Sequence, residues 1–230
     1  MMSNRVTRAT VTWLLHDGKG LSHPVIGQAV GRNKAEDRSV DPIIAAVVDI
    51  LETDGYDAVQ LREVARRSRT SLATIYKRYA TRDELILSAL QTWMEENRYS
   101  GIRVKPRGDD ESLHTALMRL LRSIFEPWEK HPAMLAAYFR ARAAPGGQRL
   151  VHRGFDIVAP AALEVLAGVD DSFIADIDTV ISSLVYGLLG RFVAGEIAVT
   201  DIVPTLDRAV FWLTSGYAAA GQSDHELLPP

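Results

Sequence analysis

The sequence predicts an all-α fold: an N-terminal three-helix head containing a helix-turn-helix, followed by a C-terminal helical bundle, about nine helices in all. Three observations support this. Apolar residues recur at helical spacing beyond residue 40, and no strand-like alternation interrupts them. Capping and breaking residues divide the chain into helix-length pieces. Residues 60–82 carry seven basic side chains against one acidic side chain, Glu63, in a chain of formal net charge −3.

The first helix is expected to open at Asp41-Pro42, because Asp is a favourable N-cap and Pro suits the first helical position. Gly55 is expected to end it. A second helix follows over residues 61–68 and a third over 72–79, the latter capped by Ser71.

A capping box, Thr81 to Glu84, marks the start of a fourth helix that is expected to reach residue 99. Pro127, His131-Pro132, Pro145-Gly146-Gly147 and Gly168 act as breakers further along. They predict five more helices, over residues 111–126, 132–143, 148–167, 171–195 and 201–217. Pro160 is expected to kink the helix that contains it.

These elements suggest four regions. Residues 1–40 read as a flexible N-terminal extension, because they are rich in glycine and lack steady periodicity. Residues 41–85 are expected to form the helix-turn-helix domain. Residues 86–220 are expected to form a second domain, for which a family resemblance implies ligand binding and dimerisation. Residues 221–230 read as a disordered tail. The basic residues of the extension also leave open a contact with DNA phosphates.

Charge distribution and composition restrict the classes of function that the protein can have. Residues 1–82 carry a net charge of +4 and residues 83–230 a net charge of −7, so one end suits a polyanion. An overall pI near 6.1 argues against indiscriminate coating of nucleic acid. The absence of cysteine excludes disulfides and thiolate chemistry. With no secretion signal and no unbroken apolar run long enough for a bilayer, a cytoplasmic protein without a membrane partner is expected.

The third helix is expected to lie in a DNA major groove. Its exposed face would carry Leu72, Ala73, Thr74, Lys77 and Arg78, while Ile75 and Tyr79 turn inward. Thr74 can bond a base edge, Ala73 can touch a thymine methyl group, and Lys77 suits guanine O6 and N7. Tyr76 and the Ser71 hydroxyl are better placed for phosphate oxygens.

The stretch from Ser71 to Leu85, SLATIYKRYATRDEL, resembles the DNA-binding signature of TetR-type transcriptional repressors, and Gly55 to Val59 and Arg62 to Ala65 also match in type and spacing. The resemblance covers residues 41–100. It implies phosphate contacts by Thr70, Ser71, Tyr76, Arg78 and Arg82, and base contacts by Ala73, Thr74 and Lys77.

One residue departs from that signature. Arg69 stands where the family usually has glycine in the turn. Either Arg69 adopts a positive φ, at a cost of about 1 kcal/mol, or the turn differs locally, and its side chain could also gain a phosphate contact. The residues from Trp93 to Tyr99 are reminiscent of actinobacterial members, some of which regulate lipid or sterol catabolism.

The resemblance further implies a ligand-binding and dimerisation domain. Aromatic side chains could together line an effector pocket, although any one of them is more often ordinary core: Trp93, Phe125, Trp128, Tyr138, Phe139, Phe155 and Tyr186. Tyr138, Tyr186 or Arg140 could anchor a polar group of the ligand. The last two helices would form the dimer interface through Leu184, Gly187, Leu188, Phe192, Leu206, Val210 and Phe211.

The resulting hypothesis is a homodimeric regulator, not an enzyme, that binds a palindromic double-stranded DNA operator and is released by a small apolar effector. No cofactor and no metal are expected, because the six histidines show no ligand spacing. One alternative is a small α-helical enzyme or lipid carrier without regulatory DNA binding; the chain shows no nucleophile–base pair or phosphate-binding loop for it. The other alternative is an architectural protein that binds DNA without regard to sequence. The net charge of −7 over residues 83–230 argues against it.

Overall fold

The protein is described by a computed structural model that covers residues 41–226, with side chains for residues 41–221. Over this range it contains only helices, so the predicted all-α class is confirmed. The α-helices are α1 (Pro42–Thr53), α2 (Leu61–Ser68), α3 (Leu72–Arg78), α4 (Arg82–Asn97), α5 (Leu113–Lys130), α6 (Pro132–Ala141), α7 (Gln148–Val165), α8 (Asp171–Val193) and α9 (Ile202–Glu226). Short 3₁₀ turns are η1 (Tyr56–Ala58), η2 (Tyr99–Gly101) and η3 (Val199–Asp201).

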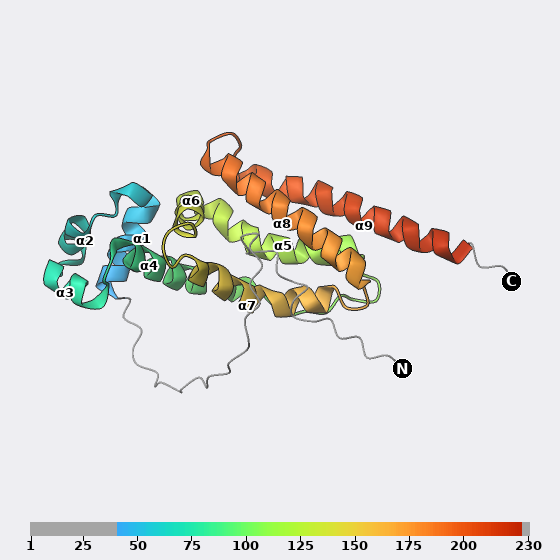
Figure 1. Cartoon of the computed structure of the whole chain (residues 1–230), viewed down its shortest axis with the longest axis horizontal. Helices are drawn as coiled ribbons and strands as arrows, with labels where there is room; N and C mark the ends of the chain where they lie inside the picture. The colour runs from blue at the N-terminus through green and yellow to red at the C-terminus, as the bar shows by residue number, and fades with distance from the viewer. Residues whose placement is uncertain (1–40, 227–230) are drawn as a thin grey trace, which may run out of the picture.

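Helices α1 to α3 form the head at one end of the molecule (Figure 1). The Asp41 carboxylate accepts the backbone N–H of Ile43, and Ser71 Oγ accepts that of Thr74, so both predicted N-caps are confirmed. Gly55 has φ of +84° directly after α1, a conformation that glycine adopts without steric cost. Residues next to the helix ends therefore determine where α1 begins and ends and where α3 begins.

Helix α4 connects the head to the bundle. It leaves α3 at a capped N-terminus, where the Thr81 hydroxyl accepts the Glu84 N–H, and runs into the body of the molecule (Figure 1). The Glu84 carboxylate accepts the N–H of Ala80 and not that of Thr81, so the predicted capping box closes one residue early. Leu85, Leu90 and Met94 are buried along its length, within one core that is continuous from head to bundle.

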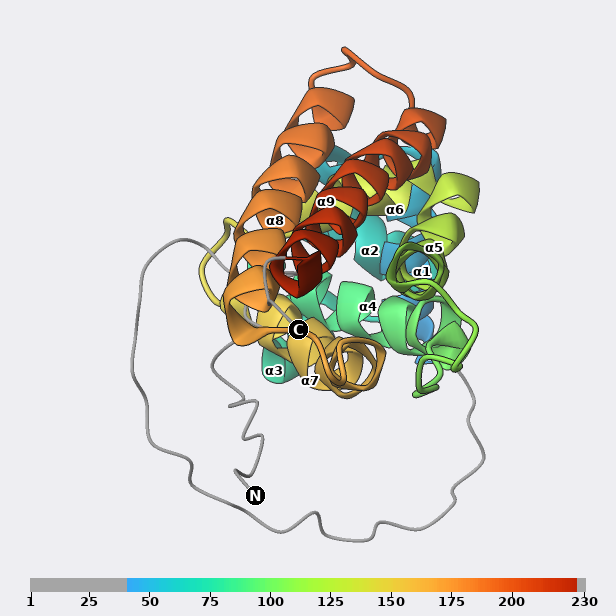
Figure 2. The same cartoon turned by 90° about the vertical axis from the view of Figure 1, so that its right-hand side faces the viewer.

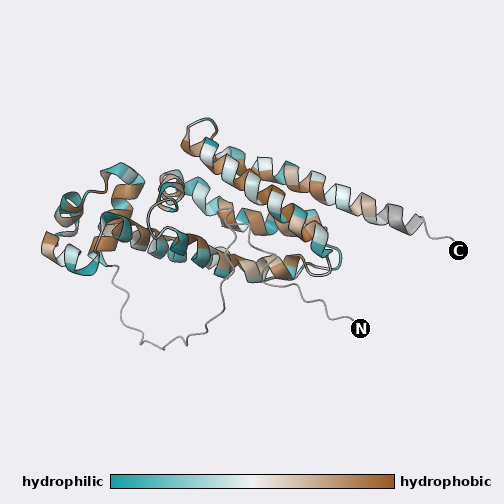
Figure 3. Cartoon of the chain, viewed as in Figure 1, coloured by the Kyte–Doolittle hydropathy of each residue, from teal (hydrophilic) through white to brown (hydrophobic). Residues whose placement is uncertain are grey.

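The bundle places α5 against α6, α7 and α9, and pairs α8 with α9 along one side. Figure 2 shows α8 and α9 side by side at the surface of the subunit, and α9 projects past the other helices in Figure 1. The hydropathy colours of Figure 3 mix apolar and polar residues along the visible side of these two helices. Their exposed apolar side chains include Val180 and Val193 of α8 and Trp212 of α9.

Several predicted boundaries were wrong. Helix α5 continues through Pro127 to Lys130, because a proline in the last turn removes one backbone N–H without stopping the helix. Helix α7, by contrast, contains Pro160 as predicted. Helix α9 extends to Glu226, past the predicted end at residue 217, so the expected disordered tail is helical from Gly221 to Glu226. The predicted extension, residues 1–40, and residues 227–230 lie outside the described range.

Helix α8 is also long and apolar enough, by length and composition, to cross a membrane, although a third of its most apolar window is buried within the subunit. Charged residues interrupt its apolar sequence, so it contains no unbroken apolar run of the length required above. In this fold α8 packs on α6 and α9, and it carries Asp176, Asp178 and Arg191. This arrangement is that of a bundle helix.

Candidate nucleic-acid interface and ligand domain

Helix α3 presents the predicted reading face to solvent. Ala73, Thr74, Tyr76 and Lys77 are exposed, with 57% of Tyr76 accessible, whereas Ile75 is fully buried. Ser71 is exposed as well, although its hydroxyl already caps the helix and lies 2.9 Å from Thr74 Oγ1. The side chains expected to meet bases therefore point away from the core.

The turn between α2 and α3 contains the strained residue that the sequence predicted. Arg69 has φ of +53° and ψ of +35°, the left-handed region, and is the one non-glycine residue with positive φ among the described residues. Its backbone N–H reaches the Arg66 carbonyl, and the next N–H, of Thr70, reaches the Ala65 carbonyl. The Arg69 side chain is exposed beside the start of α3.

A charge network holds α2 to α1. Arg67 donates to Glu63 of its own helix, to Asp49 of α1 at 2.7 Å and to Asp54 just after α1. Arg66 also donates to Glu63, and the two guanidinium groups lower the pKa of the Glu63 carboxyl to about 2. This role of Arg67 was not predicted, because Asp49 and Asp54 are distant along the chain.

Two of the predicted phosphate ligands are engaged inside the head. Arg78 forms an ion pair with the Asp41 carboxylate, which also accepts the Tyr79 hydroxyl at 3.3 Å. Arg82 donates to the carbonyls of Val59 and Tyr56, and its guanidinium lies 4.9 Å from the centre of the Tyr56 ring. Arg82 therefore holds the segment before α2, a role that the sequence did not indicate.

The cations left over form the positive surface of the head. Over residues 41–221, Arg62, Arg69 and Lys77 make no ion pair, and all three are exposed. The Thr70 hydroxyl is half-buried and donates to the Ser68 carbonyl at 3.2 Å. The surface that can attract phosphate thus centres on Arg69, Tyr76 and Lys77, at the turn and along α3.

Helix α6 fastens the bundle to the head at both of its ends. His131 Nδ1, at its start, lies 2.8 Å from the Glu52 carboxylate of α1. Arg140, near its end, donates two hydrogen bonds of 2.7 and 2.8 Å to Asp57 in η1 and covers the Tyr56 ring at 4.6 Å. Arg140, suggested as a ligand anchor, thus has an ion-pair partner in Asp57.

The predicted pocket residues do not form one cavity wall. Trp93, Trp128 and Tyr138 are buried in one aromatic cluster, with ring centres 4.9 Å apart for the two tryptophans and 5.6 Å for Trp128 and Tyr138. Phe139 contacts Tyr186 at 5.6 Å elsewhere, between α6 and α8, where 54% of Tyr186 is exposed. Phe125 is buried on α5, and Phe155 is half-buried on α7.

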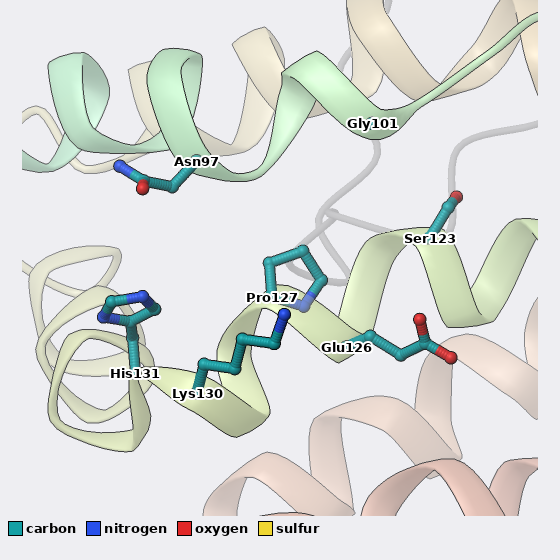
Figure 4. Close-up of a pocket in the computed structure, with 7 residues that line it drawn as sticks. All are labelled: Asn97, Gly101, Ser123, Glu126, Pro127, Lys130 and His131. Carbon is teal, nitrogen blue, oxygen red and sulfur yellow. The ribbon is translucent and has the colours of Figure 1, made fainter.

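A pocket of about 430 Å³ lies between the end of α4 and the end of α5 (Figure 4). Its lining is mostly polar in residue type: Asn97, Gly101, Ser123, Glu126, Pro127, Lys130 and His131. His131 joins it to the aromatic cluster, because the imidazole meets the Trp93 ring edge-on at 5.2 Å. Sequence reasoning missed this pocket, since none of its residues is a large apolar side chain.

The predicted dimer residues divide into two groups. Gly187 and Phe211 are exposed, and Leu184 and Phe192 are half-buried. Leu188, Leu206 and Val210 are buried inside the subunit, so assigning them to a dimer interface was wrong; their apolar faces pack within the bundle. The surface instead carries Val180, Val193 and Trp212, with 72% of Trp212 exposed. An added Cβ at Gly187 or Gly216 meets nothing within 4 Å, which leaves room for close approach.

Comparison with known families gives two matches. A model described as bacterial regulatory proteins, tetR family, matches residues 43–89, and one described as the Tetracyclin repressor-like C-terminal domain matches residues 110–213. Together they span well over half of the chain. Among curated proteins, none matches the sequence.

Solved structures show the same fold. A TetR transcriptional regulator from Rhodococcus sp. RHA1 has a TM-score of 0.55 at 17% identity, over 75% of this chain and 95% of its own. A TetR-like regulator from the same source has 0.54 at 17%, over 77% and 97%. A TetR variant from Acinetobacter baumannii AYE in complex with minocycline has 0.54 at 16%, over 81% and 98%.

Proposed function

The chain belongs to the TetR family of bacterial regulatory proteins, and on that premise we propose that it is a repressor that leaves a palindromic operator when a small effector binds. The observation that carries the proposal is the face of α3, where Thr74, Tyr76 and Lys77 are exposed around a buried Ile75. Such a face suits base edges and phosphates of one major groove. Members of the family are typically not enzymes, and we expect this one to act in the cytoplasm.

Base reading is proposed for Ala73, Thr74 and Lys77, and phosphate binding for Thr70, Ser71 and Tyr76. We add Arg69 to the phosphate set, because it is exposed and makes no ion pair over residues 41–221. Arg78 and Arg82 could reach phosphate only by sharing or leaving their partners, Asp41 and the carbonyls near Tyr56.

Selection of bound duplexes from a random pool tests the proposal, followed by gel-shift titration of the selected duplex at fixed salt. Lys77→Ala should lower the affinity about tenfold and relax discrimination at one base pair. Lys105→Ala, an exposed lysine in the loop before α5, should change the affinity less than twofold.

Discrimination below about tenfold between selected and random duplexes would favour an architectural DNA protein instead. An absence of DNA binding even at low salt would favour the enzyme or lipid-carrier alternative.

Homodimers are typical of the family, and a palindromic operator requires two heads about 34–36 Å apart. We propose that the exposed surface of α8 and α9, around Val180, Gly187, Trp212 and Gly216, forms that dimer. Trp212 is the proposed anchor, since a large and mostly exposed aromatic residue is the kind that carries interface energy.

Trp212→Asp should raise the dimer dissociation constant at least 100-fold, measured by sedimentation across a dilution series. Val104→Asp changes an apolar residue that is 58% exposed in the loop after η2, and should leave the dimer intact. A Trp212→Asp protein that stays dimeric would place the interface elsewhere.

Effector release requires that a ligand in the bundle shift the head. Three connections support such coupling: α4 is shared by both parts, and α6 holds the head through Glu52 and through Asp57. A ligand that prefers a different α4–α6 arrangement by 100-fold would contribute about 2.7 kcal/mol to release. Displacement of the selected duplex by a panel of small molecules tests this step.

A further inference from the structure

Arg98 is a buried cation that its surroundings do not neutralise. It follows α4 directly, only 3% of it is exposed, and within residues 41–221 its Nε and Nη1 atoms have no hydrogen-bond partner. No carboxylate of those residues lies within ion-pair distance of it, and Glu95 on the preceding turn is paired with Arg153 at 3.3 Å. Buried guanidinium groups are ordinarily paired, so this one requires an explanation.

The groups around Arg98 are aromatic and neutral. Its guanidinium carbon lies 5.0 Å from the centre of the Tyr99 ring and 5.7 Å from that of Trp128. Burial raises the pKa of the Tyr99 hydroxyl above its ordinary value of 10, so this group, which hydrogen-bonds Arg98, carries no charge. The rings attract the cation weakly and leave its free N–H groups without an acceptor.

The pocket of Figure 4 lies in the same gap between α4 and α5. On α4 its wall includes Asn97, the residue before Arg98. On α5 it includes Pro127, the residue before Trp128, together with Ser123, Glu126 and Lys130. His131 completes the connection, because it lines the pocket and contacts Trp93, which stacks on Trp128. The pocket thus borders the aromatic cluster through His131, and Arg98 contacts the same cluster through Trp128.

We propose that the effector is an organic carboxylate whose anionic group binds Arg98 and whose apolar or aromatic body packs against Trp93 and Trp128. The proposal deepens the proposed function: it names the chemical class of the effector and rests on the ligand-responsive role of the bundle. It also explains how binding reaches the DNA. Arg98 caps the C-terminal end of α4, whose N-terminal end carries the head.

The test uses three matched pairs of probes: hexanoate and hexanol, decanoate and decanol, and 3-phenylpropionate and 3-phenylpropanol. Binding to the full chain is measured without DNA, by calorimetry and by quenching of tryptophan fluorescence. At least one carboxylate should bind 10-fold or more tightly than its alcohol, because a hydrogen-bonded charge pair in a buried site is worth that much. No preference for the carboxylate in any pair overturns the proposal.

Two variants separate recognition from folding. Arg98→Met keeps length and removes the charge, and should reduce carboxylate affinity at least 10-fold while alcohol affinity changes less than twofold. Its melting temperature should equal or exceed that of the wild type, because an unpaired buried charge is removed. Arg103→Met, at an exposed arginine after η2, is the matched control and should change neither.

A fall in the melting temperature of Arg98→Met together with unchanged carboxylate affinity would show a structural guanidinium satisfied by buried water, and would overturn the proposal. The two levels of inference remain distinguishable. Carboxylate binding that leaves DNA affinity unaltered would keep the site and refute effector release. Release of DNA by the alcohols alone would keep the regulator and refute the role of Arg98.

Discussion

The head and the bundle treat their charged groups in opposite ways. In the head, Arg67 meets three carboxylates and Arg78 meets Asp41, while the cations without such partners, such as Lys77, are exposed. In the bundle, Arg98 and Asp178 each hold a buried side-chain atom that has no hydrogen-bond partner within residues 41–221. Among the described residues the head has one buried side-chain atom without a partner, the neutral Ser68 hydroxyl of α2, whereas the bundle leaves atoms of two charged side chains unpaired.

This difference matches the proposed tasks. A surface that reads DNA must hold its side chains in place before contact, and paired charges fix α1, α2 and α3 relative to one another. A domain that responds to a ligand must gain interaction energy when the ligand arrives, and an unpaired buried group provides that gain. Removing a charge should therefore have opposite signs in the two regions.

The largest effect is expected in the head, from Asp41→Ala. Asp41 caps α1 through the Ile43 N–H and also holds Arg78 and Tyr79 of α3. Losing the cap and the cross-helix pair should lower the free energy of unfolding by about 2 kcal/mol. Chemical denaturation followed by circular dichroism measures this.

Asp41→Asn is the matched variant, because it keeps a capping oxygen and loses the charge; it should show about half of the loss. Asp110→Ala, at an exposed residue of the loop before α5, should change stability by less than about 0.5 kcal/mol. If Asp41→Ala and the wild type are equally stable, paired charges do not stabilise the head.

The opposite sign is expected in the bundle, from Asp178→Asn. Burial raises the pKa of the Asp178 carboxyl to about 7, well above its ordinary value of 3.8. A raised carboxyl pKa favours the protonated folded form, so its stabilisation is complete below about pH 4 and is lost as pH rises through 7. At pH 8 the amide should raise stability by about 1 kcal/mol, a figure reduced because solvent still reaches part of the side chain.

Melting temperatures at pH 5 and pH 8 check this. Wild type should lose stability between the two values, and Asp178→Asn should lose less. Asp176→Asn, two residues earlier and exposed, should follow the wild-type pH dependence. A variant at Asp178 that is less stable than wild type at pH 8 would mean that the carboxylate has a partner in the folded protein.

The local structure of the head was predictable and the packing of the bundle was not, for a physical reason. Caps at Asp41 and Ser71, the inward side of Ile75 and the positive φ of Arg69 all follow from residues within a few positions of one another. The apolar stripes of α8 and α9 require burial but do not say against what, so Leu188 and Leu206 were assigned to a partner although they face their own core.

Hydrogen bonds and ion pairs between residues far apart in the chain could not be predicted from the sequence either. Arg140 with Asp57 and His131 with Glu52 join residues about 80 positions apart, and no local pattern announces them. Arg98 stands at a helix end, where an arginine is ordinarily solvated, but in the folded protein it is buried and the Trp128 ring of α5 lies 5.7 Å from its guanidinium carbon. Site residues that arise from tertiary packing need coordinates.

The smallest effect concerns the one strained position of the head. Arg69 holds a left-handed backbone at φ of +53°, a conformation that glycine adopts without steric cost. Arg69→Gly should therefore raise the free energy of unfolding by up to about 1 kcal/mol, measured by chemical denaturation. Arg103→Gly, at an exposed loop residue with negative φ, should give no such gain.

The same substitution should weaken DNA binding, because Arg69 is exposed beside the start of α3 and is proposed to meet a phosphate. The slope of log affinity against log salt should fall by about one unit, with no change in the preferred duplex. Higher stability with weaker, equally selective binding would mean that the strain is retained for a phosphate contact. Higher stability with unchanged DNA affinity would mean that Arg69 makes no phosphate contact and that only α3 contributes to the DNA-reading surface.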